Sequence, residues 1–174
     1  MATVPTTPDF TSGVSSSTQF NQLSDAIDFL LSPPIAELRQ TVAQTLTTGV
    51  WASVTFDVED KDSVSGHDTV TNNSRYTAVY AGWYQCSGGV GFVVNATGIR
   101  GTRWSVNGTA LNGSQTSEAP TTVTAAQWTP RTKQIYLNVG DYVELQAFQS
   151  SGGNLNTDVT TTNQSHMSVR WVSN

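Results

Sequence analysis

The fold is decided by residues 81–92, AGWYQCSGGVGF. Large apolar side chains recur there at alternate positions, at Tyr84, Cys86, Val90 and Phe92, and most positions between them carry Gln, Ser or Gly. Successive side chains of a β-strand point to opposite faces, so a period of two predicts a strand with one face in a core. We therefore expect this segment to be a strand that packs on one side.

Shorter segments with the same alternation lie on both sides of it. They are residues 50–56, 104–106, 135–139, 142–148 and 166–172. Asn107-Gly108 is the dipeptide typical of a two-residue hairpin. Residues 35–48 are ambiguous, because apolar residues at helical spacing alternate with threonines, and we favour a strand there. About eight to ten short strands with turns between them predict an antiparallel sandwich, barrel or jelly roll.

Composition argues against several classes of protein. The chain has 174 residues, of which 37% are hydrophobic and 12% are charged, and its net charge is −5. A nucleic-acid binder would need a basic surface. The single cysteine, Cys86, cannot form an internal disulfide, and no apolar run approaches the roughly 18 residues of a membrane span. The N-terminus lacks the basic and apolar regions of a secretory signal, so we expect synthesis in a cytoplasm.

The first 34 residues are organised differently from the rest. Residues 1–17 are rich in Pro, Thr and Ser and predict an extended arm, in which Phe10 is a candidate anchor. Residues 18–34 predict an amphipathic helix that starts with a capping box of Ser16 and Gln19 and ends in Pro-Pro. The predicted anchoring stripe consists of Phe20, Leu23, Ile27, Leu30 and Leu31. A helix this short needs a partner, which is the following domain, its own copies or another protein.

Residues 81–92 resemble the central strand motif of the jelly rolls shared by complement globular heads and tumour necrosis factor ligands. Further matches follow in the family's order, at residues 54–57, 106–108, 135–145 and 166–172. The resemblance covers about residues 36–174 and implies an all-β antiparallel jelly-roll sandwich for the head domain, residues 35–174. It also implies a tight homotrimer with aromatic side chains near the three-fold axis.

The trimer interface is predicted on the strand at residues 142–148. Tyr142 and Phe148 lie on the strand face opposite Val143, Leu145 and Ala147. If the three aliphatic side chains fill the core, the two aromatic rings need a partner or stay exposed. The opposite register, with the aromatic rings in the core, is the alternative.

The N-terminal arrangement differs from complement heads, which follow collagen repeats. An arm, one helix and a Pro-Pro break before a Thr- and Asn-rich jelly roll resemble small virion surface proteins of phages that infect actinobacteria. That resemblance implies a head mounted through residues 1–34 on a larger viral structural protein, as capsid decoration or as a minor tail protein that binds a host receptor. The alternative is a cell-encoded adhesion or signalling module that binds carbohydrate or protein.

Catalytic motifs are missing from the sequence. Its only histidines, His67 and His166, have no zinc-ligand spacing, and no nucleophile elbow or phosphate-binding loop occurs. Cys86 lies in the apolar phase of its strand, which predicts a buried and inert thiol. We therefore expect no enzymatic activity and no cofactor.

Two polar features are weaker candidates for binding sites. The acidic loop with Asp57, Glu59, Asp60 and Asp62 could hold calcium, although a solvated loop with Asx turns is the plainer interpretation. A host envelope glycan could stack on an aromatic ring near amide side chains. The aromatic candidates include Trp83, but the site is assigned to Trp128, Asn154 and Asn156, with core packing as the alternative for each Trp. Arg100 and Arg103 form a positive cluster whose plainest interpretation is a solvated strand edge.

Overall fold

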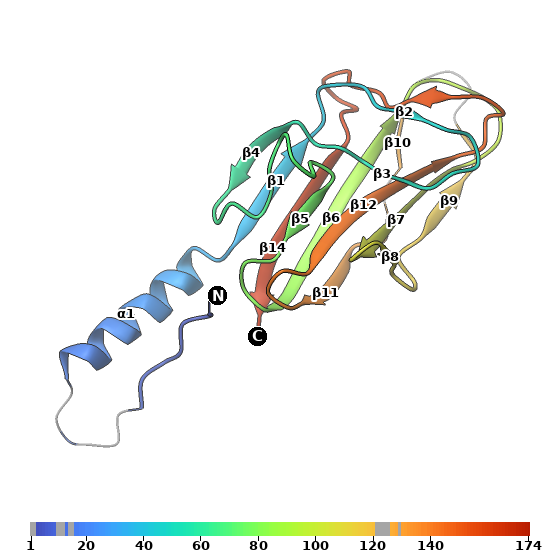
Figure 1. Ribbon diagram of the computed structural model, residues 1–174. Coiled ribbons are helices and arrows are strands. Elements are labelled where there is room, and N and C mark those ends of the chain that lie inside the picture. The colour runs from blue at the N-terminus through green and yellow to red at the C-terminus, as the bar shows by residue number, and fades with distance from the viewer. Residues whose placement is uncertain (1–2, 10–12, 14–15, 121–125, 129) are drawn as a thin grey trace.

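The computed structural model describes residues 3–9, 13, 16–120, 126–128 and 130–174. Two β-sheets pack face to face as a jelly roll, and in the described part of the chain a single helix projects from one end of the sandwich (Figure 1). This architecture confirms the predicted antiparallel jelly roll. No helix among the described residues is long and apolar enough to cross a membrane.

The first sheet has the order β10-β6-β14-β1-β4. Strand β11 lies on the same edge of β6 as β10, where β10 pairs with residues 90–92 and β11 with residues 82–86. Its strands are β1 (Ile35–Arg39), β4 (Val58–Asp62), β6 (Gly82–Phe92), β10 (Ala126–Trp128), β11 (Lys133–Leu137) and β14 (His166–Ser173). The strand prediction for residues 35–48 is confirmed at β1 and at the two-residue strand β2 (Thr45–Leu46).

The second sheet has the order β3-β12-β7-β8, with β5 on β12 and β9 on β7. Its strands are β3 (Ala52–Ser53), β5 (Arg75–Thr77), β7 (Arg100–Val106), β8 (Thr109–Ala110), β9 (Thr116–Glu118) and β12 (Tyr142–Gln149). A small third sheet pairs β2 (Thr45–Leu46) with β13 (Leu155–Asn156) at the end of the sandwich far from the helix (Figure 1).

The core lies between the two large sheets. Tyr84, Cys86, Val90 and Phe92 of β6 have no exposed surface, which confirms the buried phase predicted for residues 81–92. From the second sheet, Val143, Leu145 and Ala147 of β12 are also fully buried, together with Trp104 of β7. The register predicted for β12 is therefore correct.

Two glycine positions explain local features of these strands. Asn107 and Gly108 have φ values of 50° and 77°, which are the left-handed conformations of a type I′ turn, and they join β7 to β8 as the sequence predicts. At Gly91 in β6, a Cβ atom would lie 1.9 Å from the backbone oxygen of Asn163. A larger residue there would push the neighbouring loop away from the sheet.

The helix α1 (Ser17–Leu31) begins one residue earlier than predicted and carries the predicted capping box. The backbone N–H of Gln19 donates to Ser16 Oγ, and the backbone N–H of Ser16 donates to Gln19 Oε1. Two aromatic contacts attach the last turn to the head, because the Phe29 ring packs edge-on against Tyr80 at 5.1 Å and Trp171 at 4.8 Å. The arm also reaches the head, since Val4 packs against its core.

Candidate functional site

An exposed apolar surface lies on the outer face of the first sheet. Trp83 of β6, Tyr136 of β11 and Val172 of β14 are 42%, 46% and 44% exposed, and we call these three residues the aromatic patch. Trp83 and Tyr136 are cross-strand partners whose rings meet edge to face at 5.6 Å. Both rings point away from the core side of their strands, so part of each ring is exposed to solvent in the single chain.

Trp83 is among the sugar-binding candidates predicted from the sequence, whereas Tyr136 and Val172 are not. The signal was present in the strand pattern. Trp83 occupies the polar phase of β6, which it shares with Gln85 and Ser87, and Tyr136 stands between the buried Ile135 and Leu137. A large aromatic side chain in the outward phase of two paired strands indicates an interaction surface.

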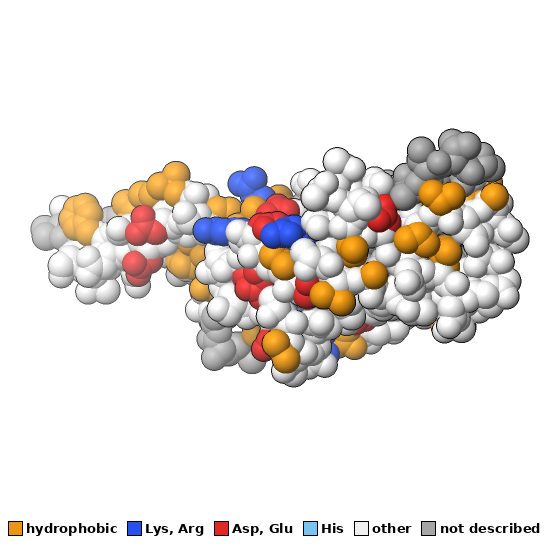
Figure 2. Space-filling view, turned by 90° about the horizontal axis from the view of Figure 1, so that it is seen from above, with side chains coloured by type: hydrophobic (Ala, Val, Ile, Leu, Met, Phe, Trp, Pro, Cys, Tyr) orange, Lys and Arg blue, Asp and Glu red, His pale blue; other side chains and the backbone are white. Residues whose placement is uncertain are grey.

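The helix root joins the aromatic patch. A shallow hollow beside α1 is lined by Leu30, Pro33, Gln85, Arg170 and Val172 together with the edge of Trp171. The hollow therefore connects the exposed side of α1 with the exposed face of the sheet. Figure 2 shows apolar side chains along the projecting helix, with basic side chains near its root.

Four of the anchoring residues predicted in α1 are exposed. Phe20, Ile27, Leu30 and Leu31 are 59%, 45%, 66% and 76% exposed, and Leu23 is half-buried. The predicted anchor Phe10 lies outside the described residues. The stripe is thus available for a partner, and which partner covers it stays a prediction.

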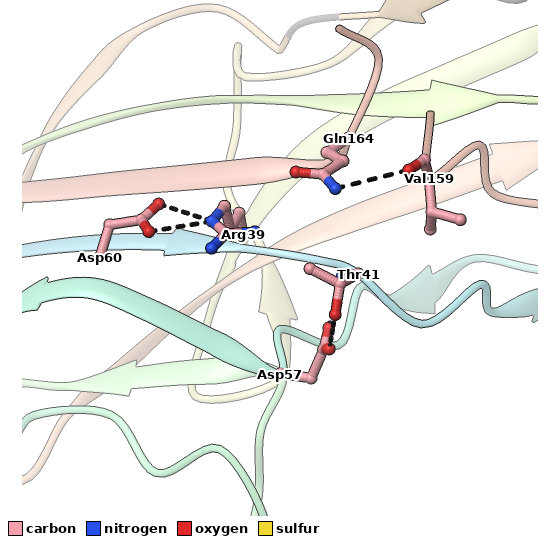
Figure 3. Close-up of polar contacts among 6 residues, drawn as sticks. All are labelled: Arg39, Thr41, Asp57, Asp60, Val159 and Gln164. Carbon is pink, nitrogen blue, oxygen red and sulfur yellow. Dashed lines mark hydrogen bonds and ion pairs between the residues drawn. The ribbon is translucent and has the colours of Figure 1, made fainter. Parts of the chain in front are cut away.

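A polar hollow lies on the same outer face, farther from the helix. It is lined by Glu37 and Arg39 of β1, Asp60 of β4, Gln164 and His166, among others. The Nε of Arg39 donates to both carboxylate oxygens of Asp60 at 2.9 Å (Figure 3). Ser168 Oγ donates to Glu37 Oε1 at 2.7 Å, so this part of the face is an ordered hydrogen-bonded surface.

The four predicted calcium ligands lie apart in separate interactions. Burial alone would raise the pKa of Asp57, but hydrogen bonds from the hydroxyl and backbone N–H of Thr41 and from the backbone N–H of Val42 together help to lower it (Figure 3). Asp60 pairs with Arg39, and Asp62 accepts from the backbone N–H of His67 at 2.8 Å.

The last of the four, Glu59, points into solvent. In the described part of the chain, no group of three or more His, Cys, Asp or Glu side chains is placed to hold a metal ion. The calcium site stays a prediction of the sequence alone.

The two rings predicted at the trimer interface, Tyr142 and Phe148, are half-buried and contact side chains of their own chain. The guanidinium of Arg75 lies 4.6 Å from the centre of the Tyr142 ring, and Trp51 packs on Phe148 at 5.2 Å. Arg103 in turn covers Trp51 at 4.1 Å and donates from Nε to Gln146. Both rings have partners in their own subunit and keep part of their surface exposed, so their place in a trimer interface stays a prediction.

The predicted glycan-binding residues do not form one site. Trp128 is only 7% exposed and packs edge-on against Phe92 at 5.3 Å, so its ring belongs to the core and cannot stack on a sugar. Asn154 and Asn156 are exposed near the small β2–β13 sheet, at the end far from α1. Asn156 Oδ1 accepts a hydrogen bond from the hydroxyl of Thr45 at 2.9 Å.

The cysteine and the two histidines of the chain differ in how far they are buried. Burial raises the pKa of the Cys86 thiol to about 12, so it stays protonated and inert at neutral pH. The ring nitrogens of His67 face the backbone oxygens of Arg75 and Phe56 at 2.9 and 3.2 Å, inside the head. His166 is exposed, on the outer face of the first sheet.

Arg100 is fully buried, and the expected solvated strand edge is wrong for this residue. Its guanidinium donates to the backbone oxygens of Asn95, Thr97 and Ile99 at 2.8 to 3.0 Å. Its Nε has no hydrogen-bond partner among the described residues. The side chain thus stabilises the conformation of the loop that leads from β6 to β7.

Comparisons with known proteins support the fold. Murine APRIL superimposes with a TM-score of 0.59 at 11% identity, over 79% of this chain and 98% of its own. The Eiger TNF protein of S. frugiperda gives 0.57 at 10% identity, over 81% and 94% of the two chains. The globular domain of a zebrafish complement 1qA protein gives 0.53 at 14%, over 78% and 92%. No protein-family model and no curated protein matches the chain.

Proposed function

We propose that this chain is a homotrimeric jelly-roll head on the surface of a bacteriophage particle, mounted by residues 1–34 on a larger viral structural protein. The observation that carries the self-association is the aromatic patch of Trp83, Tyr136 and Val172. The fold shared with complement-head and tumour necrosis factor-like domains supports the trimer. The phage assignment rests on the resemblance of the N-terminal arrangement.

Burial of the aromatic patch supplies a driving force for assembly. An aromatic side chain can bury about 150–250 Å², and more than two-fifths of Trp83 and Tyr136 still faces solvent. Covering the remaining area contributes roughly 2 kcal/mol per ring at 25 cal/mol per Å². A closed three-fold arrangement covers the patch on every subunit, whereas an open contact would leave one exposed.

The position of residues 1–34 supports their role as a mount. The helix contacts the head through its last turn, at Phe29, and the rest of its length projects beyond the sandwich (Figure 1). The loops near Asn154 and Asn156 lie at the opposite end. A mounted head would therefore present these amide side chains outward, where a tail appendage would contact a host envelope.

Light scattering on the purified chain tests the assembly. We expect a mass about three times 18.6 kDa, and we expect Trp83→Ser to dissociate the trimer into folded monomers. The matched control is Val70→Ser, because Val70 is 85% exposed and lies outside the first sheet. A stable monomer at micromolar concentration would contradict the trimer. If the Trp83→Ser variant forms a trimer as stable as that of the control, the aromatic patch is not part of the trimer interface.

Purified phage particles test the location. Imaging should place the heads on the capsid or on the tail. If they are decoration, particles without the chain should break at lower temperature, because a ligand that binds only the assembled shell stabilises it. If they are tail appendages, isolated trimers should adsorb to host cells and compete with the phage. Absence of the chain from purified particles would refute the virion assignment and favour a cell-encoded module.

A further inference from the structure

Four apolar residues of the predicted anchoring stripe in α1 have heptad spacing. Phe20, Leu23, Ile27 and Leu30 are separated by three, four and three residues, which is the spacing of the a and d positions of a coiled coil. A surface helix that packs on a globular core usually has a wider apolar face with a period of 3.6. The spacing in α1 allows this side of the helix to pack against a second helix with the same repeat, with Leu31 at the neighbouring e position.

The other sides of α1 carry acidic residues or contact the head. With Phe20 at position a, Asp25 and Asp28 fall at f and b, which point away from the seam. Phe29 falls at c and packs against Tyr80 and Trp171 of its own head. The helix is therefore attached through Phe29, while Phe20, Ile27 and Leu30 of the seam are exposed and Leu23 is half-buried.

We propose that this seam packs against the same seam of the neighbouring copies in a short parallel helical bundle. The proposal rests on the self-association proposed above. Rotational symmetry makes the helices parallel, because each one leaves its head from the same end. It assigns the predicted anchoring stripe to the other subunits and leaves the arm to contact the larger assembly.

The helix seam and the sheet interface are continuous. Leu30 ends the seam and lines the same hollow as Gln85 and Val172 on the outer face of the first sheet. Val172 belongs to the aromatic patch, so one interface can extend from the sheet onto the helix without a gap. A partner of unrelated shape would have to match both surfaces, whereas a second copy presents both.

Attachment to the heads compensates for the short length of the bundle. A helix of 15 residues is marginal alone, and two heptads do not hold isolated chains together. Once the heads associate, linked helices meet at an effective concentration in the millimolar range. The heads then set the number of helices, and the seam needs only to be apolar and in register.

Disulfide trapping tests the bundle. The background is Cys86→Ala, which removes the native thiol. Ile27→Cys at a seam position should form disulfide-linked pairs on mild oxidation, with one chain of each trimer left unpaired. Asp28→Cys, one residue further on the outer side, should form none and serves as the matched control. The mass of each reduced variant is measured by light scattering in parallel.

The two measurements separate this inference from the proposed function. A trimer in which neither variant links, or both link equally, overturns the bundle and leaves the trimeric head intact. A monomer overturns both proposals. Ile27→Asp adds a second measurement, since it should lower the melting temperature of the helical circular dichroism signal of the trimer. An unchanged melt would mean that the seam does not pack on other copies, and it too would overturn the bundle.

Discussion

Replacing the buried Arg100 by Met should destabilise the head strongly. The Arg100 guanidinium satisfies three backbone oxygens, those of Asn95, Thr97 and Ile99, and the side chain has no exposed surface. A thioether of similar length fills much of the space but donates no hydrogen bond. Each buried oxygen that loses its donor costs about 1–3 kcal/mol.

The net loss should be smaller than the sum of these costs. The residues of this loop are mostly exposed, so water can reach some of the freed oxygens. Removing a buried cation that has no carboxylate partner also offsets part of the cost. We therefore expect Arg100→Met to lower the free energy of unfolding by about 3 kcal/mol, toward the upper end of ordinary single substitutions.

Urea denaturation followed by fluorescence measures this change. Arg100→Lys should also destabilise, because an ammonium group cannot span three oxygens that a planar guanidinium reaches. Arg103→Met is the matched control on the same strand, with a half-buried side chain and one hydrogen bond to Gln146. If Arg100→Met lowers the free energy of unfolding no more than the control does, the role of Arg100 in stabilising this loop is refuted.

Three further substitutions or treatments test other parts of the structure. Phe29→Ala removes a half-buried ring and should weaken helix docking by about 2 kcal/mol, roughly half the cost of a buried Phe; hydrogen exchange in α1 should accelerate, and unchanged exchange would contradict the docking role. Three hydrogen bonds, one from Asn107 and two from Asn138, lower the pKa of Asp141. The ionised Asp141 carboxylate therefore contributes roughly 1 kcal/mol to the free energy of unfolding at pH values above 3.8, and this contribution is lost as the pH falls below that value. The free energy of unfolding of Asp141→Asn should approach that of the wild type in acid. A difference that stays constant with pH would argue against this linkage. Cys86, with its pKa near 12, should react with a thiol reagent at pH 8 only as the chain unfolds, and rapid labelling of the folded protein would show that the thiol is accessible.

Features that depend on nearby residues could be predicted from the sequence. The capping box of Ser16 and Gln19 needs only a span of three residues, and the Asn107-Gly108 turn only two. The buried phase of β6 follows from alternation within one segment. These signals determine the class of fold, because they fix where strands begin, end and face.

Features that depend on which strands become neighbours could not be predicted in the same way. Phe148 is half-buried because Trp51, from a distant part of the sequence, packs against it. Trp128 is buried because β10 pairs with β6 and brings it against Phe92. Alternation shows that a side chain faces outward, but long-range pairing decides whether another part of the chain covers it.

The connection from α1 into β1 determines how the head bears mechanical load. The helix passes through Ser32, Pro33 and Pro34 directly into β1, which is hydrogen-bonded to β14 on one side and β4 on the other. A pull along α1 therefore acts along the length of a strand held at both edges. In this shear geometry the two ladders share the force and must yield together, whereas a pull across an edge strand would open one bond at a time. A head connected in this way is suited to an exposed position where flow or collision tugs at its base.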